Sequence, residues 1–155
     1  MAILDKLTEF ADATSVGTPN NTTVNVGSQI DLSLIGRELG NGQPLYVIIS
    51  IDTAITSGGA ATPKFLVSSD STAAIAVDGT QTTHVQTDAV AIANYAAGKR
   101  WVLPLPTSDA ALHTYERFLG VQVQETAGQA LTGGTISAYL SLDPQLWKAY
   151  SDAAN

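Results

Sequence analysis

The chain has 155 residues, a length that suits one domain, and its 14 Asp and Glu outnumber its seven Lys and Arg to give a net charge of −7. It has no cysteine, which excludes disulfides, thiolate metal sites and thiol nucleophiles and suits a protein that folds and works in a reducing cytoplasm. The acidic charge repels phosphate backbones and no apolar run reaches the about 18 residues of a membrane span, so we expect neither a nucleic-acid nor a membrane partner.

The first predicted element is an N-terminal arm, residues 1–13. Its apolar residues Ile3, Leu7 and Phe10 lie roughly one helical turn apart. This spacing fits a short amphipathic helix, and it fits equally an extended arm whose apolar side chains dock on another molecule. Thirteen residues are marginal for an isolated helix, so docking would have to order the segment.

Alternating apolar and polar residues then predict a succession of β-strands. The segments are 23–26, 30–34, 45–51, 65–67, 73–77, 82–87, 101–105, 118–124 and 133–143. In the strongest, 45–51, the residue Ile48 lies on the face opposite its apolar neighbours and indicates a central strand covered on both faces. Pro104 and Pro106 remove ladder donors, so the strand at 101–105 should lie at a sheet edge.

The last predicted strand, 133–143, has the clearest alternation. One face carries Ile136, Ala138, Leu140 and Leu142, and the other carries Ser137, Tyr139 and Ser141. We expect the first set to be buried and the second to face solvent. About eight strands joined by short turns predict an all-β, single-domain, jelly-roll-like β-sandwich over residues 14–143.

Residues 88–98 are ambiguous on local grounds. Asp88 could begin a helix that ends at Gly98. Val90 and Ile92, however, alternate with alanines, which suits a strand of small residues.

Side chains suited to catalysis are few. His84 lies in a polar strand, where we expect it to face solvent, and His113 follows in a separate segment. The sequence has no Gly-x-Ser-x-Gly turn, and two isolated histidines cannot supply a zinc site. Aspartates near strand ends are typical of turn caps. We therefore expect no enzymatic activity, no cofactor and no bound metal.

The C-terminal tail, residues 144–155, carries Leu146, Trp147 and Tyr150. One helical turn would bring Leu146 and Tyr150 to one face near Trp147. Two interpretations stay open. The tail can fold back over the open end of the sandwich, or its aromatic residues can anchor a partner, since these residue types are enriched in binding hot spots.

Several segments follow one another in a recognisable order. They are Met1–Lys6, Phe10–Ala13, Ile30–Leu32, Pro44–Ile49 with Asp52-Thr53, Ala97–Pro106, Tyr115–Leu119 and Gly134–Asp143. Together they resemble the capsid cement (decoration) proteins of tailed bacteriophages, which have a jelly-roll fold. The resemblance favours a strand over residues 88–98, because that family runs extended into the Ala-Gly turn.

The resemblance implies a structural virion protein made in the host bacterial cytoplasm. Copies would bind the outer surface of the expanded phage head and cement neighbouring major capsid protein subunits, stabilising the capsid. A homodimer at two-fold positions is favoured, and a trimer is the alternative. The candidate capsid contacts are the apolar residues of the two ends: Ile3, Leu7, Phe10, Leu146, Trp147 and Tyr150. The alternative function is a carbohydrate-binding or host-attachment jelly-roll module on the virion.

Overall fold

The computed structural model describes residues 6–35, 39, 42–108 and 114–144. Within these ranges the strands are β1 (Glu9–Ser15), β2 (Thr23–Asp31), β3 (Tyr46–Ser57), β4 (Pro63–Asp70), β5 (Thr82–Gln86), β6 (Arg100–Pro104), β7 (Phe118–Glu125) and β8 (Leu131–Ser141). The helical turns are η1 (Lys6–Thr8), α1 (Leu32–Ile35) and η2 (Ile92–Asn94). None of the helices in these ranges is long and apolar enough to cross a membrane.

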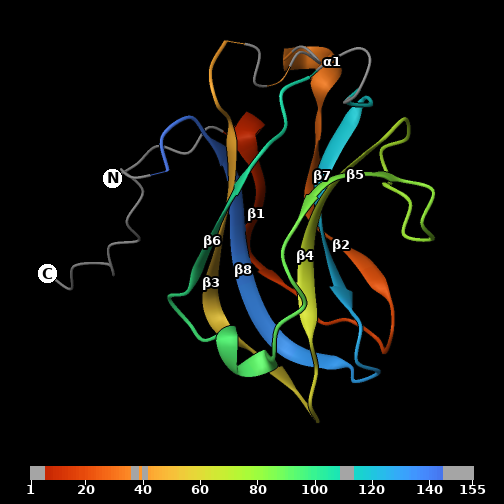
Figure 1. The fold of residues 1–155 in the computed structure, drawn as a ribbon, viewed down its shortest axis with the longest axis vertical. Helices are drawn as coiled ribbons and strands as arrows, with labels where there is room; N and C mark the ends of the chain where they lie inside the picture. The colour runs from red at the N-terminus through yellow and green to blue at the C-terminus, as the bar shows by residue number, and fades with distance from the viewer. Residues whose placement is uncertain (1–5, 36–38, 40–41, 109–113, 145–155) are drawn as a thin grey trace, which may run out of the picture.

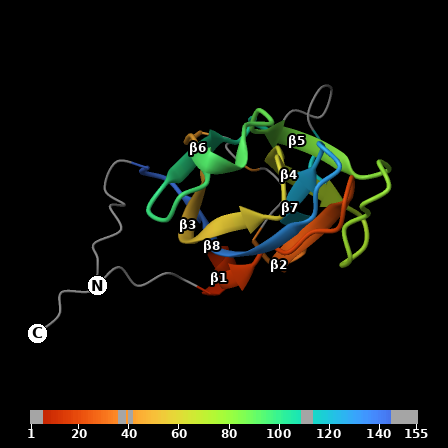
Figure 2. The same cartoon turned by 90° about the horizontal axis from the view of Figure 1, so that it is seen from below.

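The strands form two four-stranded antiparallel sheets that face each other (Figure 1 and Figure 2). Sheet A has the order β1-β8-β3-β6, and sheet B has the order β2-β7-β4-β5. β1 pairs with β8, β2 with β7, β3 with β6 and β4 with β5, as in one long hairpin that has been rolled up. This is the arrangement of a jelly roll. The predicted all-β, jelly-roll-like sandwich is therefore confirmed, as is the edge position of β6.

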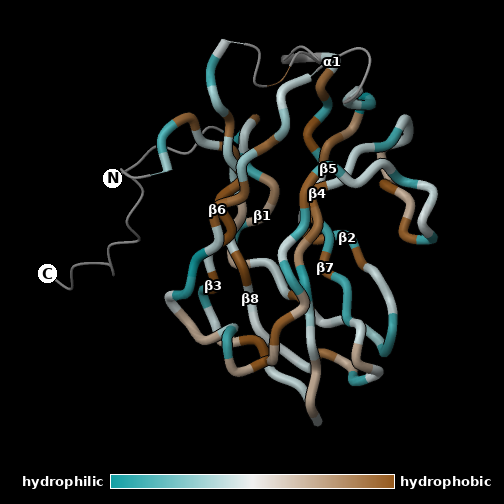
Figure 3. The backbone as a smooth tube through the Cα atoms, in the orientation of Figure 1, coloured by the Kyte–Doolittle hydropathy of each residue, from teal (hydrophilic) through white to brown (hydrophobic). Residues whose placement is uncertain are grey.

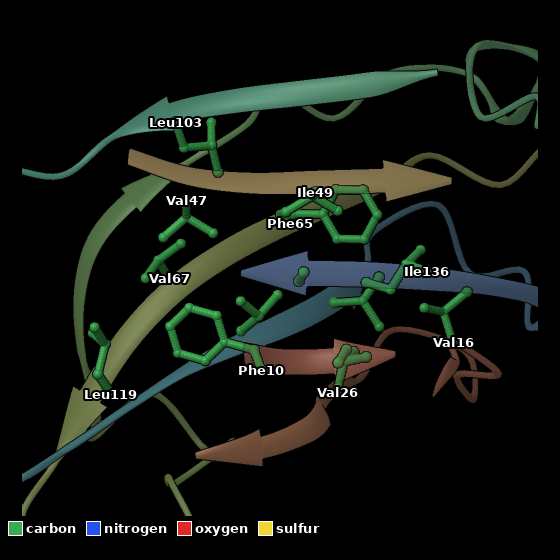
Figure 4. Packing of buried hydrophobic residues seen from close by; sticks show 14 of the residues in the cluster. Phe10, Val16, Val26, Val47, Ile49, Phe65, Val67, Leu103, Leu119 and Ile136 are labelled. Carbon is green, nitrogen blue, oxygen red and sulfur yellow. The ribbon is translucent and has the colours of Figure 1, made fainter. Parts of the chain in front are cut away.

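The inward faces of the two sheets form one hydrophobic core (Figure 4). The most apolar stretches lie on the strands, whereas the connecting turns are mostly hydrophilic (Figure 3). Towards β6 the core is aromatic. The Phe65 ring meets the rings of Tyr95 and Trp101 edge-on, each at a centroid distance of 5.7 Å. Such edge-to-face pairs stabilise a core beyond the area that they bury.

The predicted strand at 30–34 is wrong beyond Asp31, where β2 ends and α1 begins. Asp31 Oδ1 accepts a hydrogen bond of 2.9 Å from the backbone N–H of Ser33. An aspartate in this position satisfies a free N–H at the start of a helical turn and favours the turn over a longer strand. Alternation of apolar residues over five positions does not reveal this competing bond.

Residues 88–98 form neither the α-helix nor the strand that the sequence suggested; the only regular element among them is η2. The backbone N–H of Ile92 bonds to the carbonyl of Ala61, and that of Ile55 bonds to the carbonyl of Tyr95. Tyr95 is fully buried, stacks on Trp101 and donates its hydroxyl to the carbonyl of Pro63. These tertiary contacts override the local preference of the alanine-rich sequence.

The N-terminal arm predicted over residues 1–13 includes residues that belong to the sandwich. Residues 6–8 form the single 3₁₀ turn η1, and residues 9–13 belong to β1, which pairs with β8. Phe10 is only 1% exposed and packs in the core. Neither the amphipathic helix nor a separate arm therefore describes residues 9–13. Removal of residues 1–13 would delete most of an edge strand of sheet A.

Gly27 lies where the edges of the two sheets meet. Its φ is +68°, and a Cβ at this position would lie 2.0 Å from the Phe10 carbonyl oxygen and 3.1 Å from the Ala11 Cα. The β2 register shifts beside it, between Val26 and Ile30. β1 and β2 belong to different sheets, so this close backbone approach closes the seam between them, and only glycine fits it without strain.

Glu125 ties together three loops at one end of the sandwich. Its side chain is buried, and its two oxygens accept five backbone N–H bonds of 2.7 to 3.3 Å. The donors are Asn21, Thr62, Ala127, Gly128 and Gln129. Burial acts to raise the pKa of this carboxyl, but the backbone donors together outweigh it and hold the pKa below its ordinary value.

Candidate interaction surface

Part of the outer face of sheet B is covered by the chain itself. The loop over residues 71–81, which we call the strap, lies across β2 and β7. Ile75 of the strap is 2% exposed, and a Cβ at Gly120 would lie 2.6 Å from its Cδ1 atom. The side chains of Asn25 and Gln122 donate to two successive strap carbonyls at 2.8 and 2.9 Å. The strap is therefore fixed to the sheet by one apolar side chain and two amides.

The strap includes residues 73–77, so the strand predicted there is wrong. The Asp70 carboxylate accepts bonds from the backbone N–H groups of Thr72 and Ala76, at 3.2 and 2.9 Å. These bonds bend the chain at the end of β4 instead of letting it pair with a neighbouring strand. The prediction that aspartates cap the turns is confirmed here, and also at Asp78, whose Oδ1 accepts from the backbone N–H of Thr80.

The outer face of sheet A differs, because it carries an apolar patch that remains partly exposed. Val102 of β6, Ile48 of β3 and Tyr139 of β8 are cross-strand neighbours, and Pro104 and Tyr46 form the adjacent row. We call these five residues the sheet A patch. Val102 is 38% exposed, whereas Ile48 is fully buried and Tyr139 is 8% exposed. Ile48 confirms the prediction of a central strand covered on both faces.

The sheet A patch gives way to polar residues further along the same face. Arg100, Ser50 and Ser137 form the next cross-strand row, and Ser137 donates a bond of 2.8 Å to Asp52. The apolar half of the face thus lies towards the start of β1 and the end of β8. Leu142, one residue beyond β8, is 61% exposed.

Two expectations for β8 need correction. Tyr139 and Ser141, predicted to face solvent, are each only 8% exposed, and Leu142, predicted to face the core, is exposed. Tyr139 is buried because it lies beside Ile48 on a face that is itself apolar. Leu142 is exposed because β8 ends at Ser141.

Of the residues predicted as capsid contacts, the structure describes Leu7 and Phe10. Ile3, Leu146, Trp147 and Tyr150 lie outside the described residues, as does His113. Leu7 is 56% exposed beside β2, where it lines a hollow with Gln29 and Asp31. Phe10 cannot be a contact in this fold, because it is a core residue of β1.

Sequence reasoning missed the sheet A patch. The available signal was that 45–51 and 101–105 carry apolar residues on both faces, with Ile48 and Val102 on the face opposite the core. A strand that faces solvent on one side alternates more strictly. Two such strands that pair as neighbours therefore predict an apolar outer face, but only once their pairing is known.

His84 does not face solvent as predicted. It is half-buried, stacks on the Tyr115 ring at 4.0 Å and lies 2.7 Å from Ser69 Oγ. Ser69 is fully buried, and the Ser-His pair links β4 to β5. Burial raises the pKa of Tyr115 to about 12. In the described part of the chain, no group of three or more His, Cys, Asp or Glu is placed to hold a metal ion.

Comparison with known proteins gives one finding that bears on function. No curated protein matches the chain. Residues 10–140 match the protein family Bbp16, which is phage-associated. The match runs from Phe10 in β1 to Leu140 in β8 and so includes all eight strands. The chain therefore belongs to the phage-associated Bbp16 family.

Proposed function

We propose that this protein is a structural component of the virion that binds the outer surface of the expanded phage head and cements neighbouring major capsid protein subunits. The observation that carries the proposal is the difference between the two sheets. The strap covers β2 and β7 of sheet B, whereas sheet A presents a partly exposed apolar patch. Partly exposed apolar patches that are rimmed by polar residues mark sites of protein association.

The composition of the sheet A patch supports a protein partner. Two of its five residues are tyrosines. Of its charged neighbours, Arg100 and Asp52 lie at the polar end of the face, whereas Glu9 lies opposite Tyr139 on the edge strand β1 and pairs with Lys6. Interface centres are depleted in charge and enriched in tyrosine. The net charge of −7 suits the outside of a head better than a surface that faces packaged DNA.

The proposed action is thermodynamic. A protein that binds the expanded lattice more tightly than the unexpanded one shifts the equilibrium towards the expanded state. A standard protein interface buries about 1,600 Å² in total. Attachment through the sheet A patch together with the ends of the chain would combine modest contacts into a slow dissociation. Trp147 and Tyr150 remain the proposed anchors of the C-terminal tail.

Self-association forms part of the same proposal. Copies that sit on two-fold positions of the lattice would pair as homodimers, and copies on three-fold positions would form trimers. We favour the dimer. Neither arrangement requires a cofactor or a metal.

The variant Val102→Glu tests the role of the sheet A patch. A charge placed within a buried interface costs more than the about 1.4 kcal/mol that corresponds to tenfold in affinity. We therefore expect V102E to bind expanded heads at least about tenfold more weakly than the wild-type chain in a co-sedimentation titration. Its melting temperature should change little, because Val102 lies on an edge strand and is 38% exposed.

Gln86→Glu is the matched control, since it adds the same charge at an exposed position of the edge strand β5. Head binding by Q86E should equal that of the wild-type chain. Equal binding by V102E and Q86E would remove the sheet A patch from the capsid interface. Binding of a glycan, instead of heads, by the wild-type chain would favour the host-attachment function.

A further inference from the structure

The strap forms one wall of a hollow beside the start of β2 and the end of β7; Figure 1 shows the loop beside sheet B. The hollow has a volume of about 330 Å³. Its lining includes Asn21, Thr22, Val77, Asp78, Gln81 and Gln124. We call this hollow the strap groove. Its walls come from the strap, from the start of β2 and from the end of β7, so three separate parts of the chain build it.

The wall of the strap groove is held in place by bonds within the protein. Ile75 is buried against sheet B, and Gln122, which is fully buried, donates to both the Asn25 side chain and the Ala76 carbonyl at 2.9 Å. Further along, Gln81 Oε1 accepts a bond of 3.0 Å from the Gly79 N–H. A wall fixed in this way presents its side chains without a large cost in conformational entropy on binding.

An apolar and an anionic side chain stand next to each other in this wall. Val77 is 46% exposed, and the loop has a hydrophobic stretch that stands out in Figure 3. The Asp78 carboxylate follows it directly. Asp78 Oδ1 accepts from Thr80 Oγ1 at 2.7 Å, and this bond and that from the Thr80 N–H lower the pKa of Asp78. The carboxylate is therefore ionised at neutral pH.

The Asp78 carboxylate of the strap and the Asp70 carboxylate at the end of β4 lack a cationic partner within the described part of the chain. Neither Asp70 nor Asp78 forms an ion pair there, and the two repel each other. Lys64, the cross-strand neighbour of Gln124, donates to Gln86 instead. An exposed valine beside an unpaired carboxylate fits a lysine or arginine side chain, whose aliphatic stem packs on apolar surface while its charged head pairs with the acid.

We propose that the strap groove is a second capsid contact, which takes a lysine- or arginine-bearing loop of a neighbouring capsid subunit. The basic side chain lies along Val77 and pairs with Asp78, and the amides and hydroxyls of Asn21, Thr22 and Gln124 bond to the loop backbone. The inference rests on the proposed cementing function. The sheet A patch and the strap groove would then be two separate faces that bind two different subunits, as a cement requires.

The double variant Val77→Ser/Asp78→Asn tests this inference. Asparagine keeps the oxygen that accepts from Thr80 but removes the charge, so the strap should stay folded, with a melting temperature close to that of the wild-type chain. Asp88→Asn removes an equal charge from an exposed position outside the groove and is the control. Each protein is titrated onto expanded heads that lack it, at about 0.05 M and about 0.5 M NaCl, because salt screens exposed ion pairs. The temperature of head disruption is recorded at saturation.

We expect the double variant to bind expanded heads about fivefold to tenfold more weakly at low salt. At high salt the part of this difference that comes from the Asp78 charge should be lost, and the part that comes from Val77 should remain. Saturated heads should lose most of the stabilisation that the wild-type chain gives them, because the sheet A patch alone holds one subunit. Asp88→Asn should behave as the wild-type chain. If the double variant binds and stabilises heads as the wild-type chain does, or if Asp88→Asn has the same effect, the strap groove is not a contact. If the wild-type chain itself does not bind heads, the proposed function and this inference both fail.

Discussion

Replacement of Glu125 by alanine should lower the free energy of unfolding by about 3 kcal/mol or more, which corresponds to about 10 °C in melting temperature for a chain of this size. The carboxylate is buried and accepts five backbone N–H bonds from three loops. Bonds to a charged acceptor are each worth more than neutral ones, and their loss leaves donors unpaired. Urea unfolding at about pH 7, followed by circular dichroism, measures the change.

The stability that Glu125 contributes should fall as the pH is lowered. The folded state holds the pKa of Glu125 below the ordinary value of 4.5, so its contribution to stability is complete above that pH and is lost as the pH falls through the folded pKa. The stability difference between the wild-type chain and Glu125→Gln should therefore shrink in acid. Glu116→Gln is the control, because Glu116 Oε1 accepts one bond, from Thr82. If the stability difference between the wild-type chain and Glu125→Gln stays constant as the pH falls from neutral into acid, Glu125 is not ionised in the folded state.

Replacement of Gly27 by alanine should destabilise the protein by about 3 kcal/mol, the sum of left-handed backbone strain and a steric clash. The new Cβ would lie 2.0 Å from the Phe10 carbonyl oxygen, which belongs to an edge strand of the other sheet. Relief of the clash would open the seam between β1 and β2. We expect a lower midpoint of urea unfolding and faster hydrogen exchange of β1 amides.

Gly98→Ala separates the two causes. Gly98 has a φ of +81°, but no atom lies within 4 Å of the position that a Cβ would take. This variant should cost only the backbone strain, about 1 kcal/mol. If G27A and G98A are destabilised equally, the close approach of the two sheets at Gly27 does not contribute to stability.

The strands were predictable because their pattern is local. In β8, Ile136, Ala138 and Leu140 alternate with polar residues, and all three are buried as predicted. The pattern failed where a single side chain changed the course of the backbone. Asp31 and Asp70 each accept backbone N–H bonds that start a turn, and the strands predicted at 32–34 and 73–77 are absent for this reason.

The candidate surfaces depend on contacts between distant parts of the chain, and this is why sequence reasoning did not find them. The sheet A patch exists because β3, β6 and β8 are neighbours in register. The strap groove exists because Gln122 and Gly120 of β7 seat a loop some 45 residues earlier in the chain. Phe10 shows the converse error, since its spacing with Leu7 suggested an exposed arm although strand alternation places it in the core.

Co-sedimentation of the purified wild-type chain with expanded phage heads that lack it, beside unexpanded proheads, tests the cementing function most directly. We predict saturable binding to expanded heads, at a fixed number of copies per head, and no binding to proheads. Such binding should also raise the temperature at which the heads are disrupted. Absence of binding to either particle, or equal binding to both, would contradict a cement that recognises the expanded lattice.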